Sequence, residues 1–216
     1  FTRTWNTEFG ENVEAVSSAS LRRNGDKLVG NSEVLAKDLH GLLGAETFAI
    51  RVKNLYPEAY QETVDIAREE KNTNARPELL SHIEDMEKYK KIILIYPVWW
   101  STIPMPVYTF LEEYDFAGKT ILPIATHKGS FLGDSVEDIR ALLPEAKVKT
   151  GIAVSGSSVD FLMLWFIGVF VGIIIVIISG ILRYNWKTDK KKARIALLVC
   201  VFGIVVIVYS IVRLII

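Results

Sequence analysis

Three short segments of the sequence carry side chains that could bind a phosphate group and a planar ring. The segments are Thr2-Arg3-Thr4, Pro97-Val98-Trp99-Trp100-Ser101-Thr102 and Thr126-His127-Lys128-Gly129-Ser130. Their hydroxyl groups can donate hydrogen bonds to an anion, and their indole and imidazole rings offer flat walls. If the three segments lie close together, they form a pocket suited to a phosphate and a planar ring.

Each of these segments follows an apolar run that is typical of a buried strand. Residues 92–96 (IILIY) precede the double tryptophan, residues 120–125 (TILPIA) precede the histidine segment, and residues 1–4 could be the end of another strand. Residues 47–52 (TFAIRV) and 151–154 (GIAV) have the same character. Open parallel sheets bind ligands beyond the carboxyl ends of their strands, which is where the three segments lie.

Helical patterns alternate with the apolar runs. They cover residues 31–43, 58–71, 106–114 and 135–143. The alternation predicts an α/β domain with a parallel sheet over residues 1–156. Residues 5–29 interrupt it as a polar insertion in which Asn24-Gly25 could turn a small hairpin.

Three segments and the tetrapeptide Asn74-Ala75-Arg76-Pro77 carry a resemblance to a known family. Residues 96–106 (YPVWWSTIPMP) and 110–120 (FLEEYDFAGKT), followed by 126–130 (THKGS), resemble the flavodoxin family of FMN-binding proteins. The likeness is strongest to its bacterial branch with a Tyr-Pro-x-Trp-Trp loop, and it covers roughly residues 30–155.

The resemblance implies a doubly wound, five-stranded parallel sheet in the order 2-1-3-4-5, with FMN at the carboxyl ends of the strands. It implies that the phosphate lies at a helix N-terminus, a favourable place for an anion. The residues that it assigns to the phosphate are Thr2, Arg3, Thr4, Gly30, Asn31 and Ser32. Those that it assigns to the ring are Pro97, Val98, Trp99, Trp100, Ser101, Thr102, Thr126, His127, Gly129 and Ser130.

The first strand is central in such a sheet, yet only Phe1 represents it here. We therefore expect further residues upstream of Phe1.

An acid–base residue is not required for electron transfer, and no spacing of His, Asp or Glu predicts a metal site. The single cysteine, Cys200, excludes an intramolecular disulfide.

The carboxyl-terminal part of the sequence has a different composition. Residues 161–182 are 22 uncharged residues, and residues 195–216 are 22 residues with Arg213 as their one charge. Each length suits a transmembrane helix, so the pair predicts a membrane hairpin. The connector, residues 183–194, holds six basic residues and one acidic residue.

Charge divides the chain in the same way. The net charge is zero overall, but it is −6 over residues 1–160 and +6 over residues 161–216. The acidic part argues against nucleic-acid binding, which needs a basic surface. We expect the hairpin to lie in the cell membrane and the preceding domain to lie in the cytoplasm, where FMN and its electron donors are found. The basic connector favours the opposite orientation.

These features together predict a membrane-tethered FMN protein that transfers electrons to a redox partner protein or a small-molecule acceptor. An alternative is a quinone or nitro-compound reductase that uses NAD(P)H. A further alternative is a flavin-free adaptor, or a subunit of a membrane complex, on a degenerate flavodoxin fold.

Overall fold

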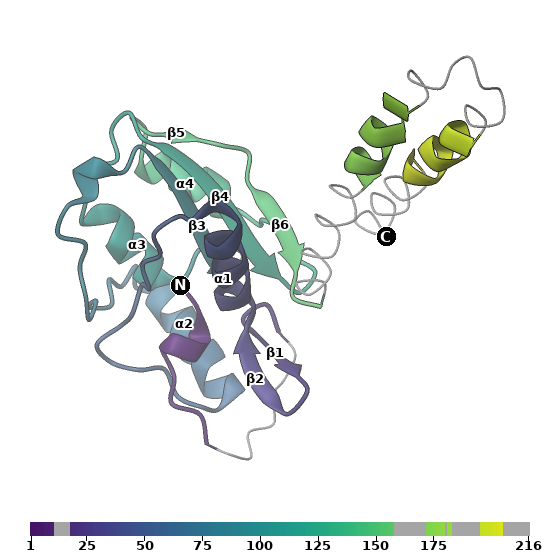
Figure 1. Ribbon diagram of the computed structural model, residues 1–216. Helices are drawn as coiled ribbons and strands as arrows, with labels where there is room; N and C mark the ends of the chain where they lie inside the picture. Colours follow the sequence, from purple (N-terminus) through teal and green to yellow (C-terminus); the bar gives the residue numbers. More distant parts are fainter. Residues whose placement is uncertain (11–17, 158–171, 180, 183–194, 205–216) are drawn as a thin grey trace. The chain divides into compact units, whose positions relative to one another are not determined.

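The computed structural model describes residues 1–10, 18–157, 172–179, 181–182 and 195–204 (Figure 1). The chain divides into two compact units, Phe1–Val159 and Asp160–Ile216.

A parallel sheet forms the centre of the first unit. Strand β3 (Lys91–Pro97) pairs with β4 (Thr120–His127), with Tyr96 opposite Ala125. The other edge of β4 pairs with two successive short strands, β5 (Lys147–Val148) and β6 (Ile152–Ser155). The prediction of a parallel α/β fold is confirmed, and the strands expected at residues 92–96, 120–125 and 151–154 are present.

Helices cover both faces of this sheet. Helix α1 (Asn31–Leu43) lies over one face of β3 and β4, whereas α3 (Met105–Glu112) and α4 (Ser135–Leu142) lie on the other (Figure 1). Helix α2 (Tyr60–Asn72) contacts α3. Each of the four lies within about two residues of its predicted bounds. Single helical turns occur at η1 (Arg3–Trp5) and η2 (Met86–Lys88).

The predicted hairpin within the insertion is confirmed. Strand β1 (Leu21–Asn24) pairs antiparallel with β2 (Lys27–Gly30), and Gly25 makes the turn with a φ of 60°. Strand β2 runs directly into α1. The hairpin therefore lies beside the start of that helix.

Two predicted strands are not formed. Residues 1–4 lead into the turn η1, and residues 47–52 are irregular apart from one isolated bridge between Val52 and Leu79. The five-stranded order 2-1-3-4-5 is therefore wrong for the described residues, whose parallel sheet has four strands. A strand needs a neighbour to satisfy its backbone groups. Residues 46–50 instead face β3 across a cavity of about 450 Å³.

In the second unit, residues 172–179 and 195–204 are helical. They pack closely, because a Cβ at Gly203 would lie 2.9 Å from Cγ2 of Ile175. Across the described parts of both units, no helix has the combined length and apolar character that a membrane span requires. Connector residues 183–194 and residues 161–171, 180 and 205–216 of the two predicted spans lie outside the described residues.

Candidate functional site

The loops that follow β3 and β4 lie side by side, as the sequence predicts for two neighbouring parallel strands. Val98 N–H donates to the carbonyl of Thr126 (2.8 Å), and Asp134 N–H donates to the carbonyl of Ser101 (2.6 Å). Gly133 passes so close to Ser101 that a Cβ at Gly133 would lie 2.3 Å from the Ser101 carbonyl oxygen. The tryptophan segment and the histidine segment therefore form one continuous surface.

A tight turn presents the two tryptophans. The backbones of Trp99 and Thr102 exchange two hydrogen bonds of 3.0 Å. Trp100 and Ser101, at the centre of the turn, have φ values of 49° and 67°. Both therefore adopt the left-handed conformation, which costs a side-chain-bearing residue about 1 kcal/mol. Because this conformation is unfavourable, the surrounding structure must hold the turn in its observed shape.

Trp99 is held in place by contacts from distant parts of the chain. Its indole N–H donates to Oγ of Ser20 in the insertion (2.8 Å). Its ring meets Phe1 and Tyr56 edge-on, at centroid distances of 5.4 and 5.2 Å. The hydroxyl of Tyr56 donates in turn to the carboxylate of Glu70 (2.8 Å), and burial raises the pKa of Tyr56. Trp99 is thus a fixed wall of the site.

Trp100 lies against α2 and is 41% exposed. Its indole N–H donates to the carbonyl of Val64 (3.0 Å), and the guanidinium of Arg68 lies 4.7 Å from the ring centroid. Lys71 Nζ donates to the Trp100 carbonyl (2.6 Å). Two cations therefore lie beside the exposed tryptophan.

A cavity of about 250 Å³ opens beside both tryptophans. It combines two indole walls with hydroxyl groups and one buried guanidinium. Its lining consists of Arg3, Ser18, Ala19, Ser20, Tyr60, Thr63, Val64, Ala67, Val98, Trp99 and Trp100. Such a mixture suits a flat molecule that also carries polar acceptors.

His127, at the end of β4, is buried and stacks on the exposed ring of Phe131 at 5.0 Å. Its Nδ1 accepts a hydrogen bond from Gly129 N–H (3.0 Å), so the proton of the neutral ring is on Nε2. Burial lowers the pKa of His127. Gly129 has a φ of 104° and no atom within 4 Å of an added Cβ, and Ser130 is exposed. This loop is therefore open to a ligand.

The amino-terminal segment meets the start of α1, as predicted. The hydroxyl groups of Thr2 and Thr4 are 3.1 Å apart, and a Cβ at Gly30 would lie 2.1 Å from the first and 2.5 Å from the second. Oγ of Ser32 lies 3.2 Å from Oγ1 of Thr126. Hydroxyl groups from the amino-terminal segment, α1 and β4 therefore gather near one helix N-terminus.

Three of the predicted site residues have their side chains engaged elsewhere. The guanidinium of Arg3 donates to the carbonyls of Pro57 (2.8 Å) and Glu58 (2.7 Å). Thr102 Oγ1 lies 3.0 Å from the hydroxyl of Tyr108 and also bonds the carboxylate of Asp138. The buried Asn31 amide donates to the Ser18 and Ala19 carbonyls, and its oxygen accepts from Arg22.

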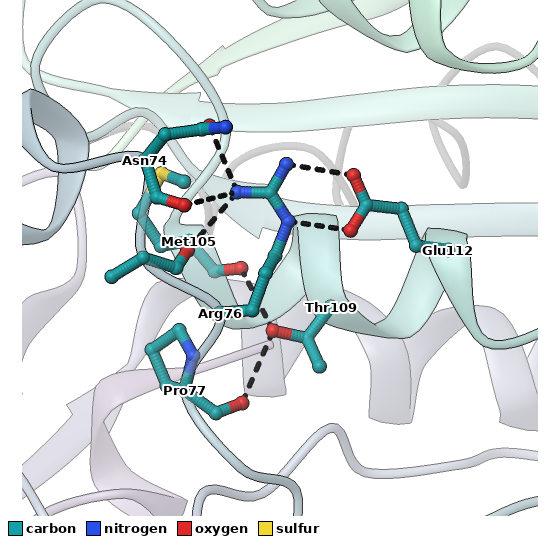
Figure 2. Close-up of polar contacts among 7 residues, drawn as sticks. Asn74, Arg76, Pro77, Met105, Thr109 and Glu112 are labelled. Carbon is teal, nitrogen blue, oxygen red and sulfur yellow. Dashed lines mark hydrogen bonds and ion pairs between the residues drawn. The ribbon is translucent and has the colours of Figure 1, made fainter.

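The motif Asn74-Ala75-Arg76-Pro77 is a structural clamp rather than part of the site (Figure 2). Arg76 binds the Glu112 carboxylate through two nitrogens, with Nη2 2.7 Å from Oε1, and its Nη1 donates to Asn74 Oδ1 (2.9 Å). Thr109 donates to the Pro77 carbonyl (3.1 Å). The hydrogen bonds from Arg76 lower the pKa of Glu112. The clamp fastens the segment after α2 to α3.

Several residues around the site were not evident from the sequence. Ser20, Tyr56 and Arg68 reach the tryptophans from segments far away in the sequence, and no local pattern marks them. Phe131, by contrast, belongs to the loop that the sequence places after residues 120–125, and it is 68% exposed with a φ of 52°. No cluster of metal-ligating side chains occurs within the described ranges.

Comparisons with known proteins bear on the family and the fold. The family model for flavodoxin matches residues 27–168. A proposed flavoprotein from Bacteroides eggerthii DSM 20697 has a similar structure, with a TM-score of 0.54 and 25% sequence identity, covering 61% of this chain and 87% of that one. No curated protein matches the sequence.

Two further solved structures share the fold. A proposed flavoprotein from Bacteroides uniformis ATCC 8492 has a TM-score of 0.52 at 24% identity, covering 62% of this chain and 89% of that one. A flavoprotein from Lactobacillus acidophilus NCFM, solved in complex with FMN, has a TM-score of 0.50 at 21% identity, covering 60% and 88%.

Proposed function

Because the chain belongs to the flavodoxin family, we propose that its amino-terminal domain binds FMN beyond the carboxyl ends of β3 and β4 and serves in electron transfer. The observation that carries this proposal is the joined surface of the Trp99–Thr102 turn and the His127–Ser130 loop. FMN supplies the redox chemistry when bound, and the protein supplies binding, orientation and the electrostatic environment.

The residues present fit the ring of FMN. Trp99 and Trp100 offer flat apolar walls. Ser101 follows them in the same turn, where its φ is positive. On the second loop, Gly129 leaves open space, and Ser130 is an exposed hydroxyl that can donate to ring oxygen or nitrogen atoms. A fixed aromatic wall excludes water from one side of a flavin ring.

The phosphate end of the site relies on hydroxyl groups. Thr2, Thr4 and Ser32 lie at the amino end of α1, where the helix dipole favours an anion. Two groups nearby disfavour phosphate binding at this position. The Asn31 N–H already donates to the Ser20 carbonyl (2.9 Å), and the Glu33 carboxylate accepts a hydrogen bond from Thr4 (2.6 Å). Because the single proton of the Thr4 hydroxyl is donated to Glu33, we infer that the phosphate takes its hydrogen bonds from the hydroxyls of Thr2 and Ser32.

The absorption spectrum of the purified full chain, with and without added FMN, tests the proposal. Bound flavin gives a yellow protein whose flavin fluorescence is quenched. Trp100→Ala should weaken FMN binding about threefold to tenfold, since an aromatic contact contributes about 0.5–1.5 kcal/mol. Phe48→Ala removes an aromatic side chain that stacks on Phe110 instead, and should leave FMN affinity unchanged. A chain that binds no FMN refutes the proposal and favours the flavin-free adaptor.

A second candidate function is an NAD(P)H-dependent reductase of quinones or nitro compounds. The cavity of about 250 Å³ beside Trp99 and Trp100 favours it, because its indole walls and the Ser18 and Ser20 hydroxyl groups in its lining suit a flat acceptor with oxygen atoms. Oxidation of NAD(P)H by the FMN-loaded chain, accelerated by a quinone, would support this function. A flavin that exchanges electrons only with a redox partner protein would support the electron carrier.

We also propose that residues 161–182 and 195–216 anchor the domain in the cell membrane as a helical hairpin. The uncharged 22-residue length of the first segment and the close packing at Gly203 support it. Resistance of the chain to alkaline extraction from membranes tests the anchor. Protease added to intact cells tests orientation: cleavage within residues 1–160 would place the domain outside, as the basic connector 183–194 favours, and protection would place it in the cytoplasm.

A further inference from the structure

One face of helix α2 holds Trp100 at three points. The carbonyl of Val64 accepts the indole N–H (3.0 Å), and the guanidinium of Arg68 lies 4.7 Å from the ring centroid. Lys71 Nζ donates to the Trp100 carbonyl (2.6 Å). Positions 64, 68 and 71 are separated by four and three residues, so they lie on the same face of the helix. Helix α2 therefore holds both the ring and the backbone of Trp100.

The two cations on this face of α2 have different surroundings. Arg68 Nη2 lies 3.1 Å from the Asp65 carboxylate, which offsets the charge of the guanidinium. Within the described residues no ion pair joins Lys71 to a carboxylate, and its ammonium bonds a neutral carbonyl instead. Lys71 therefore places a positive charge beside the tryptophan turn, in a domain whose net charge is negative.

The hydrogen bond from Lys71 sets the direction of the peptide group between Trp100 and Ser101. The carbonyl and the N–H of a planar trans peptide point in opposite directions, so the Ser101 N–H points away from Lys71. Ser101 is exposed, and its N–H has no acceptor among the described residues. This N–H is therefore a donor that is held in one direction and left available to a ligand.

The tryptophan turn depends on such contacts from outside it. Trp100 and Ser101 both have positive φ values, 49° and 67°, which are unfavourable for residues that carry a side chain. The Ser101 carbonyl is held by the Asp134 N–H (2.6 Å) from the neighbouring loop, and the Trp100 carbonyl is held by Lys71 (2.6 Å). Loss of the Lys71 bond would leave the Trp100–Ser101 peptide without its support from α2.

We propose that Lys71 is a positioning residue of the FMN site, an inference that rests on the proposed FMN function. Its ammonium holds the Trp100 carbonyl toward α2, and the Ser101 N–H is thereby directed at the bound ring. Reduction of FMN by two electrons and one proton adds one negative charge to the ring, which a peptide N–H and a nearby cation both favour. Lys71 therefore strengthens the binding of reduced FMN relative to oxidised FMN.

The midpoint potential of the FMN-loaded full chain in mild detergent tests this preference. Lys71→Met should weaken the binding of reduced FMN about threefold to tenfold relative to oxidised FMN, and tenfold corresponds to a potential about 30 mV lower. Lys71→Arg should keep the wild-type potential, because a guanidinium carries the same charge and can donate to the same carbonyl. Lys53→Met removes a lysine that pairs with Glu78 (2.8 Å) and is the matched control for the lost charge. An unchanged potential in Lys71→Met, or an equal fall in Lys53→Met, would overturn the proposal.

Hydrogen exchange of the FMN-free chain, measured by mass spectrometry, provides a second arm that does not use the cofactor. The Thr102 N–H donates to the Trp99 carbonyl across the turn (3.0 Å), so its exchange reports whether the turn is held. Lys71→Met should speed exchange in residues 98–103 at least threefold, whereas Lys71→Arg and Lys53→Met should leave it unchanged. Equal exchange in Lys71→Met and the wild type would overturn the proposal. Failure of the proposed function is distinguishable, because the chain would then bind no FMN although the exchange difference persists.

Discussion

Replacing Gly133 by alanine should damage the candidate site through a single contact. Gly133 has a φ of 54°, and an added Cβ would lie 2.3 Å from the carbonyl oxygen and 2.9 Å from the carbonyl carbon of Ser101. Both atoms belong to the backbone of the turn that presents the two tryptophans. The methyl group cannot be accommodated by a side-chain rotation, so one of the two loops must move.

The expected cost has two parts. A left-handed conformation costs an alanine about 1 kcal/mol relative to glycine. Forcing a methyl group into a filled space adds about 1–3 kcal/mol. Gly133→Ala should therefore lower the free energy of unfolding by about 2–4 kcal/mol, and it should weaken FMN binding because the Trp99–Thr102 turn is displaced.

Gly44 provides a matched control for the conformational part. Its φ is 61°, close to that of Gly133, but no atom lies within 4 Å of an added Cβ. Gly44→Ala should cost about 1 kcal/mol and leave FMN affinity unchanged. Urea unfolding and FMN titration of both variants separate the two effects. If Gly133→Ala lowers the free energy of unfolding by no more than Gly44→Ala does, the close contact between the two loops does not exist.

Three further predictions concern single interactions. Ser20→Ala removes the acceptor of the Trp99 indole and should cost about 1 kcal/mol in urea unfolding, with a shift in tryptophan emission; unchanged emission would contradict the bond. Glu112→Gln should cost about 1 kcal/mol or less, because its ion pair with Arg76 is partly exposed. Since Arg76 lowers the pKa of Glu112, that contribution is lost as pH falls, and the Gln variant should lack this acid dependence. His127 should titrate below its ordinary pKa of 6.5 in NMR, and stability should fall as pH drops below 6.5 because only the unfolded chain protonates readily there. A His127 pKa above 6.5 would refute its burial.

The parts of the fold that follow from local pattern were predictable. The runs at residues 92–96 and 120–125 become β3 and β4 because they are continuously apolar and are buried in the centre of the domain. Residues 47–52 have the same pattern but do not form a strand. Pairing depends on a neighbour, which no window of sequence around Thr47 contains.

The candidate site was predictable to the same extent. The sequence predicted that the Trp99–Thr102 and His127–Ser130 segments lie side by side, because each directly follows one of two neighbouring strands. It could not predict that Ser20 would bind the Trp99 indole, since 79 residues separate them. It also could not predict that the Arg3 guanidinium would bind the carbonyls of Pro57 and Glu58, because tertiary packing decides where a long side chain lies.

The contact of Thr2 and Thr4 with Gly30 has a consequence for how the sequence can change. The chain leaves the site after Thr4 and returns to the same place at Gly30, although 25 residues lie between them. An insertion whose two ends are in contact can be lengthened or shortened with little effect on the elements that it connects. The β1–β2 hairpin, whose Ser20 side borders the tryptophans, is therefore the part of the domain where length and sequence can change while the sheet is preserved.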